Sequence, residues 1–212
     1  MDLMTRRRAL LARVESGGRL PVEYQEVEYI ESIGRQCIDT GFYIDQNSAV
    51  ECKVLIEKNT QNRFYYGASQ KYDTSAFECY VWNTDIQYNT QNIIGNIGIS
   101  DLPDSFIGII KHSKDGRILE YSNIVKSLPA VSISTFQTPK HLTLFALNRS
   151  GGLMFGVARI YYLKLYMDEE LVEYLIPCYR KADSKPGMYD FASGTFLTNA
   201  GTGEFVVGAD VN

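Results

Sequence analysis

Residues 50–56 (Val50-Glu51-Cys52-Lys53-Val54-Leu55-Ile56) decide the fold class, because apolar and charged side chains alternate along most of this stretch. Successive side chains of a β-strand point to opposite faces, so a period of two gives one apolar face and one polar face. Similar alternation occurs at residues 26–30 and 76–82. Each of these stretches is therefore predicted to be a strand with one buried face.

Further short segments rich in β-branched and aromatic residues are predicted strands. Turn-forming sequences such as Lys114-Asp115-Gly116 and Ala192-Ser193-Gly194 separate them. After residue 21 no helical periodicity and no repeat of fixed period is found, so the sequence predicts an all-β sandwich or barrel. The further strand candidates are residues 63–66, 86–88, 106–111, 117–121, 131–136, 142–147, 156–167, 172–176, 188–191, 195–197 and 205–207.

Residues 1–19 differ from the rest of the chain in periodicity and in charge. Apolar residues recur at near-helical spacing up to Val14, and Ser16-Gly17-Gly18 ends the pattern. Residues 1–20 hold five Arg and two acidic residues, a net charge of +3, whereas the remaining 16 basic and 23 acidic residues give −7. We expect a basic helical tether with a glycine linker over residues 1–19, either a flexible leader or an anchor, and a β-sandwich domain over residues 20–212.

Composition argues against several classes of protein. A net charge of −4 is unlike that of a nucleic-acid-binding surface, and no run of 18 apolar residues predicts a membrane-spanning helix. The N-terminal segment lacks the apolar core of a secretory signal peptide. The four cysteines form no CxxC pair and only two histidines are present, so no zinc site is predicted. We expect the cysteines to be buried free thiols, as in a protein assembled in a reducing cytosol.

Sequence motifs at both ends of the chain resemble those of a family of phage and prophage structural proteins. The opening motif is LPVEYQEVEYIES (residues 20–32) with QCIDTG (residues 36–41), and TRRRAL (residues 5–10) resembles the family's leader. The closing motifs are FGVARIY (residues 155–161), IPCYRK (residues 176–181), GMYDF (residues 187–191) and FLTNAGTG (residues 196–203). Cys37 and Glu173 depart from the pattern, which usually has Tyr and Arg there, and residues 60–135 are the variable part.

The resemblance implies a concanavalin A-like (laminin-G-like) jelly roll in which the N- and C-terminal strands pair. It also implies a virion component of the tail, baseplate, head-fibre or decoration type, assembled in the bacterial host cytoplasm and serving adhesion or display. We therefore expect a non-enzymatic module that forms homo-oligomers. Residues 1–18 would attach it to other virion proteins, through Arg6, Arg7, Arg8, Leu10 and Leu11.

The aromatic region between residues 65 and 88 is the candidate carbohydrate site. Sugars bind to aromatic rings through their apolar C–H faces and to planar polar groups through their hydroxyls. Strand parity places Tyr80 and Trp82 on the face opposite Phe77, Cys79 and Val81. Core packing is the alternative role for these rings. The candidate residues are Tyr65, Tyr72, Tyr80, Trp82, Asn83, Asp85 and Tyr88.

A glycoside hydrolase on the same fold is the alternative function. Glu26 and Glu31 have the E-x-[DE]-x-x-E spacing of retaining glucanases, in which two carboxyl groups lie about 5–5.5 Å apart. Against it, Glu28 replaces the usual Asp, and a period of two places Glu26 and Glu31 on opposite faces. A decoration protein with no ligand is a third possibility.

The remaining polar residues predict no catalytic or metal centre. His112 and His141 have no nucleophile at motif spacing, so both are expected to be surface residues at strand ends. No cofactor is predicted. A Ca²⁺ ion would need converging carboxylates, for which Asp73, Asp85 and Asp104 are available, but no loop has the spacing of a calcium site.

Overall fold

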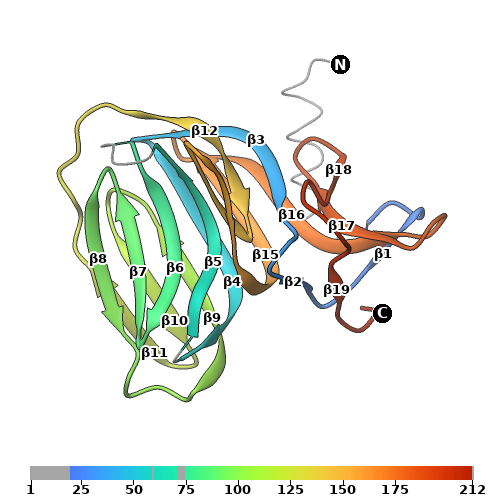
Figure 1. Ribbon diagram of the computed structural model, residues 1–212, viewed down its shortest axis with the longest axis horizontal. Helices are drawn as coiled ribbons and strands as arrows, with labels where there is room; N and C mark the ends of the chain where they lie inside the picture. The colour runs from blue at the N-terminus through green and yellow to red at the C-terminus, as the bar shows by residue number, and fades with distance from the viewer. Residues whose placement is uncertain (1–19, 59, 71–74, 212) are drawn as a thin grey trace.

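The computed structural model describes residues 20–58, 60–70 and 75–211, which form nineteen β-strands and no helix. Within these residues no helix is long and apolar enough to cross a membrane. The helix expected over residues 1–14 lies outside the described part of the chain. The strands form two sheets that face each other as a sandwich (Figure 1).

The larger sheet has eleven strands, and its main path runs β11-β10-β9-β4-β15-β16-β17-β18. β1 pairs with β16, and β2 lies between β15 and β19. The bounds are β1 Tyr24–Glu26, β2 Ile30–Ile33, β4 Ser48–Glu57, β9 Ser105–His112, β10 Arg117–Tyr121, β11 Ile124–Leu128, β15 Val157–Met167, β16 Glu170–Arg180, β17 Lys185–Asp190, β18 Thr195–Thr198 and β19 Val206–Val207.

The smaller sheet has eight strands in the order β14-β13-β5-β6-β7-β8, with β12 pairing both β5 and β3. Pairing is antiparallel in both sheets, except that β13 runs parallel to β5 where Arg149 lies beside Ser69. The bounds are β3 Ile38–Asp45, β5 Thr60–Ser69, β6 Phe77–Asn83, β7 Asp85–Thr90, β8 Ile93–Gly98, β12 Gln137–Leu144, β13 Ala146–Arg149 and β14 Gly152–Phe155.

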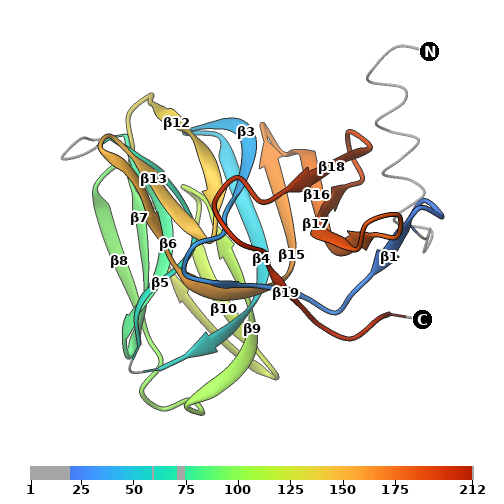
Figure 2. The same ribbon diagram turned by 45° about the vertical axis from the view of Figure 1, so that its right-hand side comes forward.

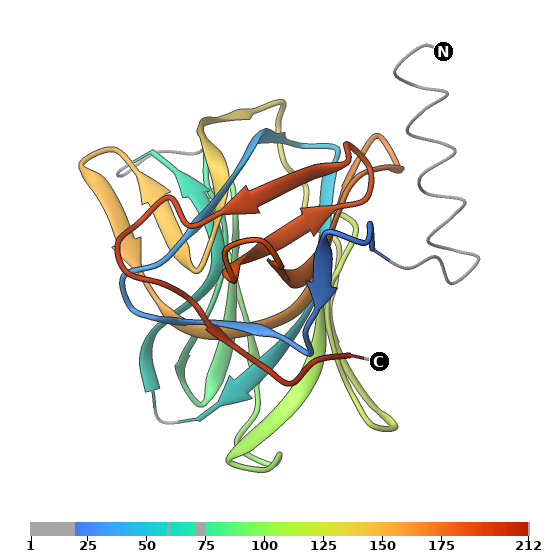
Figure 3. The same ribbon diagram turned by 90° about the vertical axis from the view of Figure 1, so that its right-hand side faces the viewer.

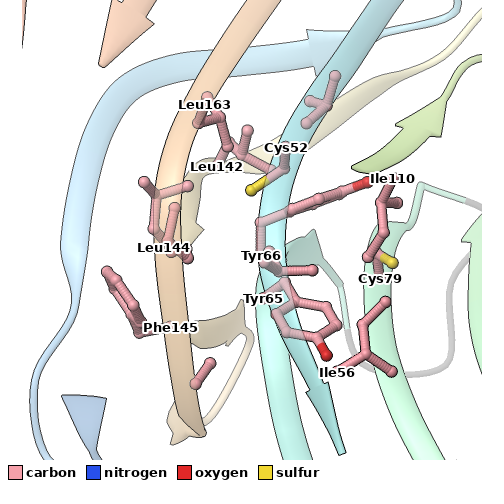
Figure 4. Packing of buried hydrophobic residues seen from close by; sticks show 14 of the residues in the cluster. Cys52, Ile56, Tyr65, Tyr66, Cys79, Ile110, Leu142, Leu144, Phe145 and Leu163 are labelled. Carbon is pink, nitrogen blue, oxygen red and sulfur yellow. The ribbon is translucent and has the colours of Figure 1, made fainter. Parts of the chain in front are cut away.

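The core fills the space between the inner faces of the two sheets. Along β4, buried and half-buried side chains alternate without interruption, so the prediction from residues 50–56 is confirmed. Cys52 and Ile56 meet Cys79 of β6 and the two tyrosines of β5 there (Figure 4). Burial of these apolar side chains stabilises the sandwich by roughly 25 cal/mol for each Å² removed from water.

A β-bulge in β5 explains why two consecutive tyrosines are both buried. The register with β6 shifts between Phe64, which lies opposite Tyr80, and Tyr66, which lies opposite Cys79. The extra residue lets Tyr65 and Tyr66 both point inward, and both are 0% exposed. The Tyr65 hydroxyl donates a hydrogen bond to the Leu55 carbonyl at 2.9 Å.

The ends of the described chain lie beside each other on the larger sheet. β19 pairs with β2, and the Val211 amide donates to the Glu26 carbonyl at 3.0 Å (Figures 2 and 3). A second, smaller apolar cluster includes Ile176 of β16 and Tyr189 of β17. Their chain neighbours Leu175 and Met188 point to the opposite face and belong to the main core.

Three strand predictions are wrong in whole or in part. Residues 142–147 are divided, because β12 ends at Leu144 and β13 begins at Ala146. Residues 131–136 form no strand, because they belong to the connection that crosses from β11 of one sheet to β12 of the other. The strand predicted at residues 26–30 is divided, since β1 ends at Glu26 and β2 begins at Ile30. This break moves the chain from β16 to β15.

Candidate functional site

A cavity of about 460 Å³ opens on the outer face of the smaller sheet, over β5, β6 and β7 and beside the β13–β14 hairpin. We refer to it as the groove. Aromatic side chains line one part of it and polar side chains line the other. Its aromatic residues are Phe64, Tyr80 and Trp82, and its polar residues include Ser69, Gln70, Glu78, Gln87, Asn89, Asn92 and Arg149.

β6 supplies the central row of the groove. Its alternation sends Phe77, Cys79 and Val81 into the core, where each is 0% exposed. Glu78, Tyr80 and Trp82 point the opposite way and line the groove. The Trp82 side chain is 43% exposed. The prediction that Tyr80 and Trp82 lie on the face of the strand that points away from the core is therefore confirmed.

The neighbouring strands bring further side chains next to this row. Phe64 of β5 lies opposite Tyr80, and the two ring centroids are 5.2 Å apart. On the other side, β7 places Gln87 beside Tyr80 and Asn89 beside Glu78. An aromatic side chain and a planar amide thus flank Tyr80 on the same face of the sheet.

The β13–β14 hairpin forms one wall of the groove. Leu147 pairs with Met154 in this hairpin, and both side chains line the groove. Leu147 also covers Gly67 of β5, where a Cβ atom would lie only 2.7 Å from Leu147 Cδ1. The missing side chain at Gly67 therefore lets the hairpin approach the sheet closely.

Glu78 is the most deeply buried charged group of the groove. Its side chain is hydrogen-bonded to Ser69 and Asn89, and the residue is 8% exposed. Burial raises the pKa of the Glu78 carboxyl above its ordinary value, although the two hydrogen bonds and nearby Arg149 oppose the shift. Within the described part of the chain, the buried Asn89 Oδ1 atom has no hydrogen-bond partner. That oxygen is available to accept a hydrogen bond from a ligand hydroxyl.

Two of the predicted sugar-binding residues lie in the core instead. Tyr65 is turned inward by the β-bulge, and Tyr88 of β7 is turned inward by its parity. Both are 0% exposed, and the Tyr88 hydroxyl donates to the Ile118 carbonyl at 3.0 Å. Neither ring reaches the groove, so their assignment to it is wrong.

The other predicted residues lie at the end of the β6–β7 hairpin or outside the described chain. Asn83 ends β6 with a positive φ of 55°, and Asp85 begins β7 opposite Trp82, on the same face of the sheet. Neither residue is part of the lining of the groove. Tyr72 lies outside the described residues, as do Arg6, Arg7, Arg8, Leu10 and Leu11 of the predicted attachment segment.

The sequence did not single out Phe64, Glu78, Gln87, Asn89 or Arg149. Glu78 shares its face with Tyr80 and Trp82, so the parity of β6 was a usable signal. Arg149 belongs to a strand far along the chain, and only the parallel pairing of β13 with β5 places it here.

The two carboxylates of the alternative hydrolase lie on different strands with different partners. Glu26 is on β1 beside Cys178, and burial raises the pKa of its carboxyl. Glu31 is on β2, where its Oε2 atom accepts hydrogen bonds from Arg159 Nε at 2.9 Å and Nη2 at 2.7 Å. Glu31 is thus held by a guanidinium on the neighbouring strand.

The histidines occupy different environments. His141 is at the surface, where its Nδ1 atom lies 3.0 Å from Asp39 Oδ1. His112 is 1% exposed, so the prediction that it lies on the surface is wrong. The His112 side chain is one of those on β9 that point inward, and it packs against Phe77 in the core.

Two of the three carboxylates considered for calcium lie among the described residues. Asp104 is a surface partner of Lys58 at 3.6 Å, and Asp85 begins β7, whereas Asp73 lies outside the described residues. Among residues 20–58, 60–70 and 75–211, no group of three or more His, Cys, Asp or Glu side chains is arranged to hold a metal ion.

No protein-family model matches the chain, and no curated protein matches it significantly. A functional assignment therefore depends on the geometry of the groove and on the sequence motifs.

Proposed function

We propose that the protein is a non-enzymatic carbohydrate-binding module of a phage or prophage particle and that the groove binds the sugar. The observation that carries this proposal is the half-exposed Trp82 ring in a cavity of about 460 Å³, next to Tyr80 and to planar amides. A hexose buries its apolar C–H face on such a ring. Gln87, Asn89 and Asn92 supply hydrogen-bonding groups for its hydroxyls.

The number of carboxyl groups in the groove favours sugar binding over sugar hydrolysis. Glycosidases of the usual kind need two carboxyl groups on either side of the scissile bond. Among the described residues that line the groove, Glu78 is the one with a carboxyl group. Its hydrogen bonds to Ser69 and Asn89 give it a positioning role for the amides around it.

The particle context rests on the sequence motifs, and the fold supports it. The resemblance implies a concanavalin A-like jelly roll with paired terminal strands. The described chain is an all-β sandwich in which Val27 bridges Asp210 and β19 pairs with β2. In this proposal residues 1–18 bind other virion proteins, and homo-oligomers compensate for weak single-site binding through avidity. Tail or capsid genes beside the coding gene are the expected genomic context.

Binding of the purified protein to a glycan array tests the proposal. We expect a defined set of glycans to bind the wild type, and Trp82→Ala to lose about tenfold or more in affinity because the stacking platform is removed. Tyr43→Ala is a matched control, since Tyr43 is similarly exposed at 44% but lies on β3 outside the groove.

Three outcomes contradict the proposal. Equal binding by the wild type and Trp82→Ala, or no binding to any glycan, excludes the groove as a sugar site. Release of reducing sugar from a polysaccharide panel, abolished by Glu26→Gln, establishes the hydrolase instead.

A further inference from the structure

We infer that the groove selects an acidic glycan, whose sugar carboxylate is bound by Arg149. The inference rests on the proposed function, because it names the class of sugar for the same groove. Three features support it: the direction of the Arg149 side chain, the absence of an ion pair or hydrogen bond from this side chain to another described residue, and the burial of Glu78, the carboxyl group of the groove.

The position of Arg149 on β13 directs its side chain into the groove. Leu147 and Arg149 share one face of the strand and both line the groove. Asn148 between them points the other way, and its Nδ2 atom donates to the His141 carbonyl at 3.2 Å. Arg149 pairs with Gly152, directly before the β13–β14 turn, so its guanidinium lies at the end of the wall.

Three other arginines of the described chain are engaged by carboxylates, whereas Arg117 donates to the Pro129 carbonyl at 2.9 Å. Arg63 binds Glu57 at 2.7 Å, Arg159 binds Glu31 at 2.7 Å and Arg180 binds Asp183 at 2.6 Å. Arg149 has no ion pair or hydrogen bond through its side chain to another described residue. A guanidinium offers a planar fork of donors that matches the two oxygens of a carboxylate.

Glu78 carries the one carboxyl group among the described residues that line the groove, and it forms no ion pair with Arg149. Arg149 lies beside Ser69 of β5, and Glu78 lies on the next strand opposite Gly67, so their Cα atoms are about 12 Å apart at the usual spacing of strands and residues. Glu78 is bonded to Ser69 and Asn89, and its burial raises its pKa. The raised pKa lowers the charge that Glu78 presents to an incoming anion at mildly acidic pH.

The length of the groove suits more than one sugar ring. Glu78 and Trp82 are four residues apart on β6, which corresponds to about 13 Å along an extended strand. The acidic residue of the glycan then lies at the Arg149 end, and a neutral residue stacks on Trp82. We therefore expect a disaccharide or longer unit with one uronic or sialic acid.

Titration calorimetry with matched pairs of ligands tests the inference. The pairs are trigalacturonic acid with its methyl ester, and sialyllactose with lactose. We expect the acidic member of at least one pair to bind about tenfold or more tightly than its neutral counterpart, because charge-assisted hydrogen bonds are stronger than neutral ones. Its affinity should fall with added NaCl.

Variants separate this inference from the proposed function. Arg149→Gln should abolish the preference for the acidic member, so that the two members of each pair bind with similar affinity, whereas Arg149→Lys should keep part of the preference. Arg35→Gln, an exposed arginine outside the groove, is the matched control. The folding of each variant is checked by its unfolding midpoint.

The inference is overturned if neutral and acidic members bind equally or if Arg149→Gln keeps the preference. Sugar binding that is lost in Trp82→Ala but shows no preference for the acidic member of either pair overturns the inference and leaves the proposed function intact. Absence of any glycan binding overturns both.

Discussion

At the residue scale, His112 shows how the core controls protonation. Its ring stacks on Phe77 with the centroids 3.9 Å apart, and its Nε2 atom lies 2.7 Å from Thr90 Oγ1. Burial, together with nearby Arg117, lowers the pKa of His112 from 6.5 to about 3. The folded protein therefore resists binding a proton that the unfolded chain accepts below pH 6.5.

This difference predicts a loss of stability in acid. Between pH 6.5 and 3 the contribution of His112 lowers the free energy of unfolding by about 1.4 kcal/mol per pH unit, and above pH 6.5 the effect is absent. Urea unfolding at pH 7, 6 and 5 measures the slope, which should be smaller in His112→Gln. His141→Gln keeps His112 and controls for the loss of a histidine; the same slope in all three proteins would contradict the prediction.

Single residues also show which site predictions succeed. Tyr80 and Trp82 were placed on the groove face because β6 keeps a strict period of two. Tyr65 was not predicted to be buried, since a β-bulge shifts its parity and the sequence contains no signal for that bulge. Tyr88 is buried because of the parity of β7. The sequence prediction grouped the aromatic residues by their position in the chain and did not assign Tyr88 to a face of the sheet.

At the element scale, the β17–β18 hairpin depends on Gly187. A Cβ atom there would lie 2.3 Å from the Leu197 carbonyl oxygen and 2.9 Å from the Phe196 ring. The two strands pair through this point, with Gly187 opposite Thr198. Because backbone is the closest neighbour, a side chain at this position cannot be accommodated without moving β18.

Gly187→Ala is therefore expected to lower the free energy of unfolding by about 1–3 kcal/mol, as overpacked interiors do. Gly98→Ala is the matched control in strand β8, where the nearest atom to a new Cβ lies 3.7 Å away. Urea denaturation of both variants checks the prediction. Equal stabilities would show that the hairpin adjusts freely.

Strand existence was predictable where alternation is strong, and strand ends were not. β4 follows the pattern of residues 50–56 throughout. Residues 142–147 were predicted as one strand, but Phe145 has a positive φ of 63°, so β12 ends and β13 begins there. This kink changes the direction of the chain at the start of the strand that carries Arg149. It depends on tertiary packing, which local strand propensity does not describe.

At the scale of the whole molecule, the four cysteines confirm the expectation of buried free thiols. Cys52, Cys79 and Cys178 lie within strands, Cys37 directly precedes β3, and none forms a disulfide. Burial raises the pKa of Cys37 to about 11 and that of Cys178 to about 12. The reactive thiolate is therefore scarce at neutral pH.

The native protein should thus react very slowly with a thiol reagent such as dithionitrobenzoate, and unfolding in guanidinium should expose all four thiols. A reducing agent should leave the unfolding midpoint unchanged, because no disulfide contributes to stability. Rapid reaction of one thiol in the native protein would contradict this packing.

Prediction of the complete site required knowledge of the sheet order. The aromatic part of the groove comes from adjacent strands β5 and β6, so local sequence indicated it. Arg149 reaches the groove through the parallel contact of β13 with β5, between residues far apart in the sequence. Such non-local pairings have no local sequence signature, so they are the part of a site that a single sequence does not predict.

The close approach of the two ends of the described chain has a practical consequence. Gln25 Nε2 donates to the Val211 carbonyl at 3.1 Å, and the C-terminus lies on the opposite side of the sandwich from β6, β7 and β8 (Figures 1 and 2). A copy immobilised by its C-terminus, on a sensor chip or on a larger particle, therefore turns its groove away from the support and toward molecules that diffuse past.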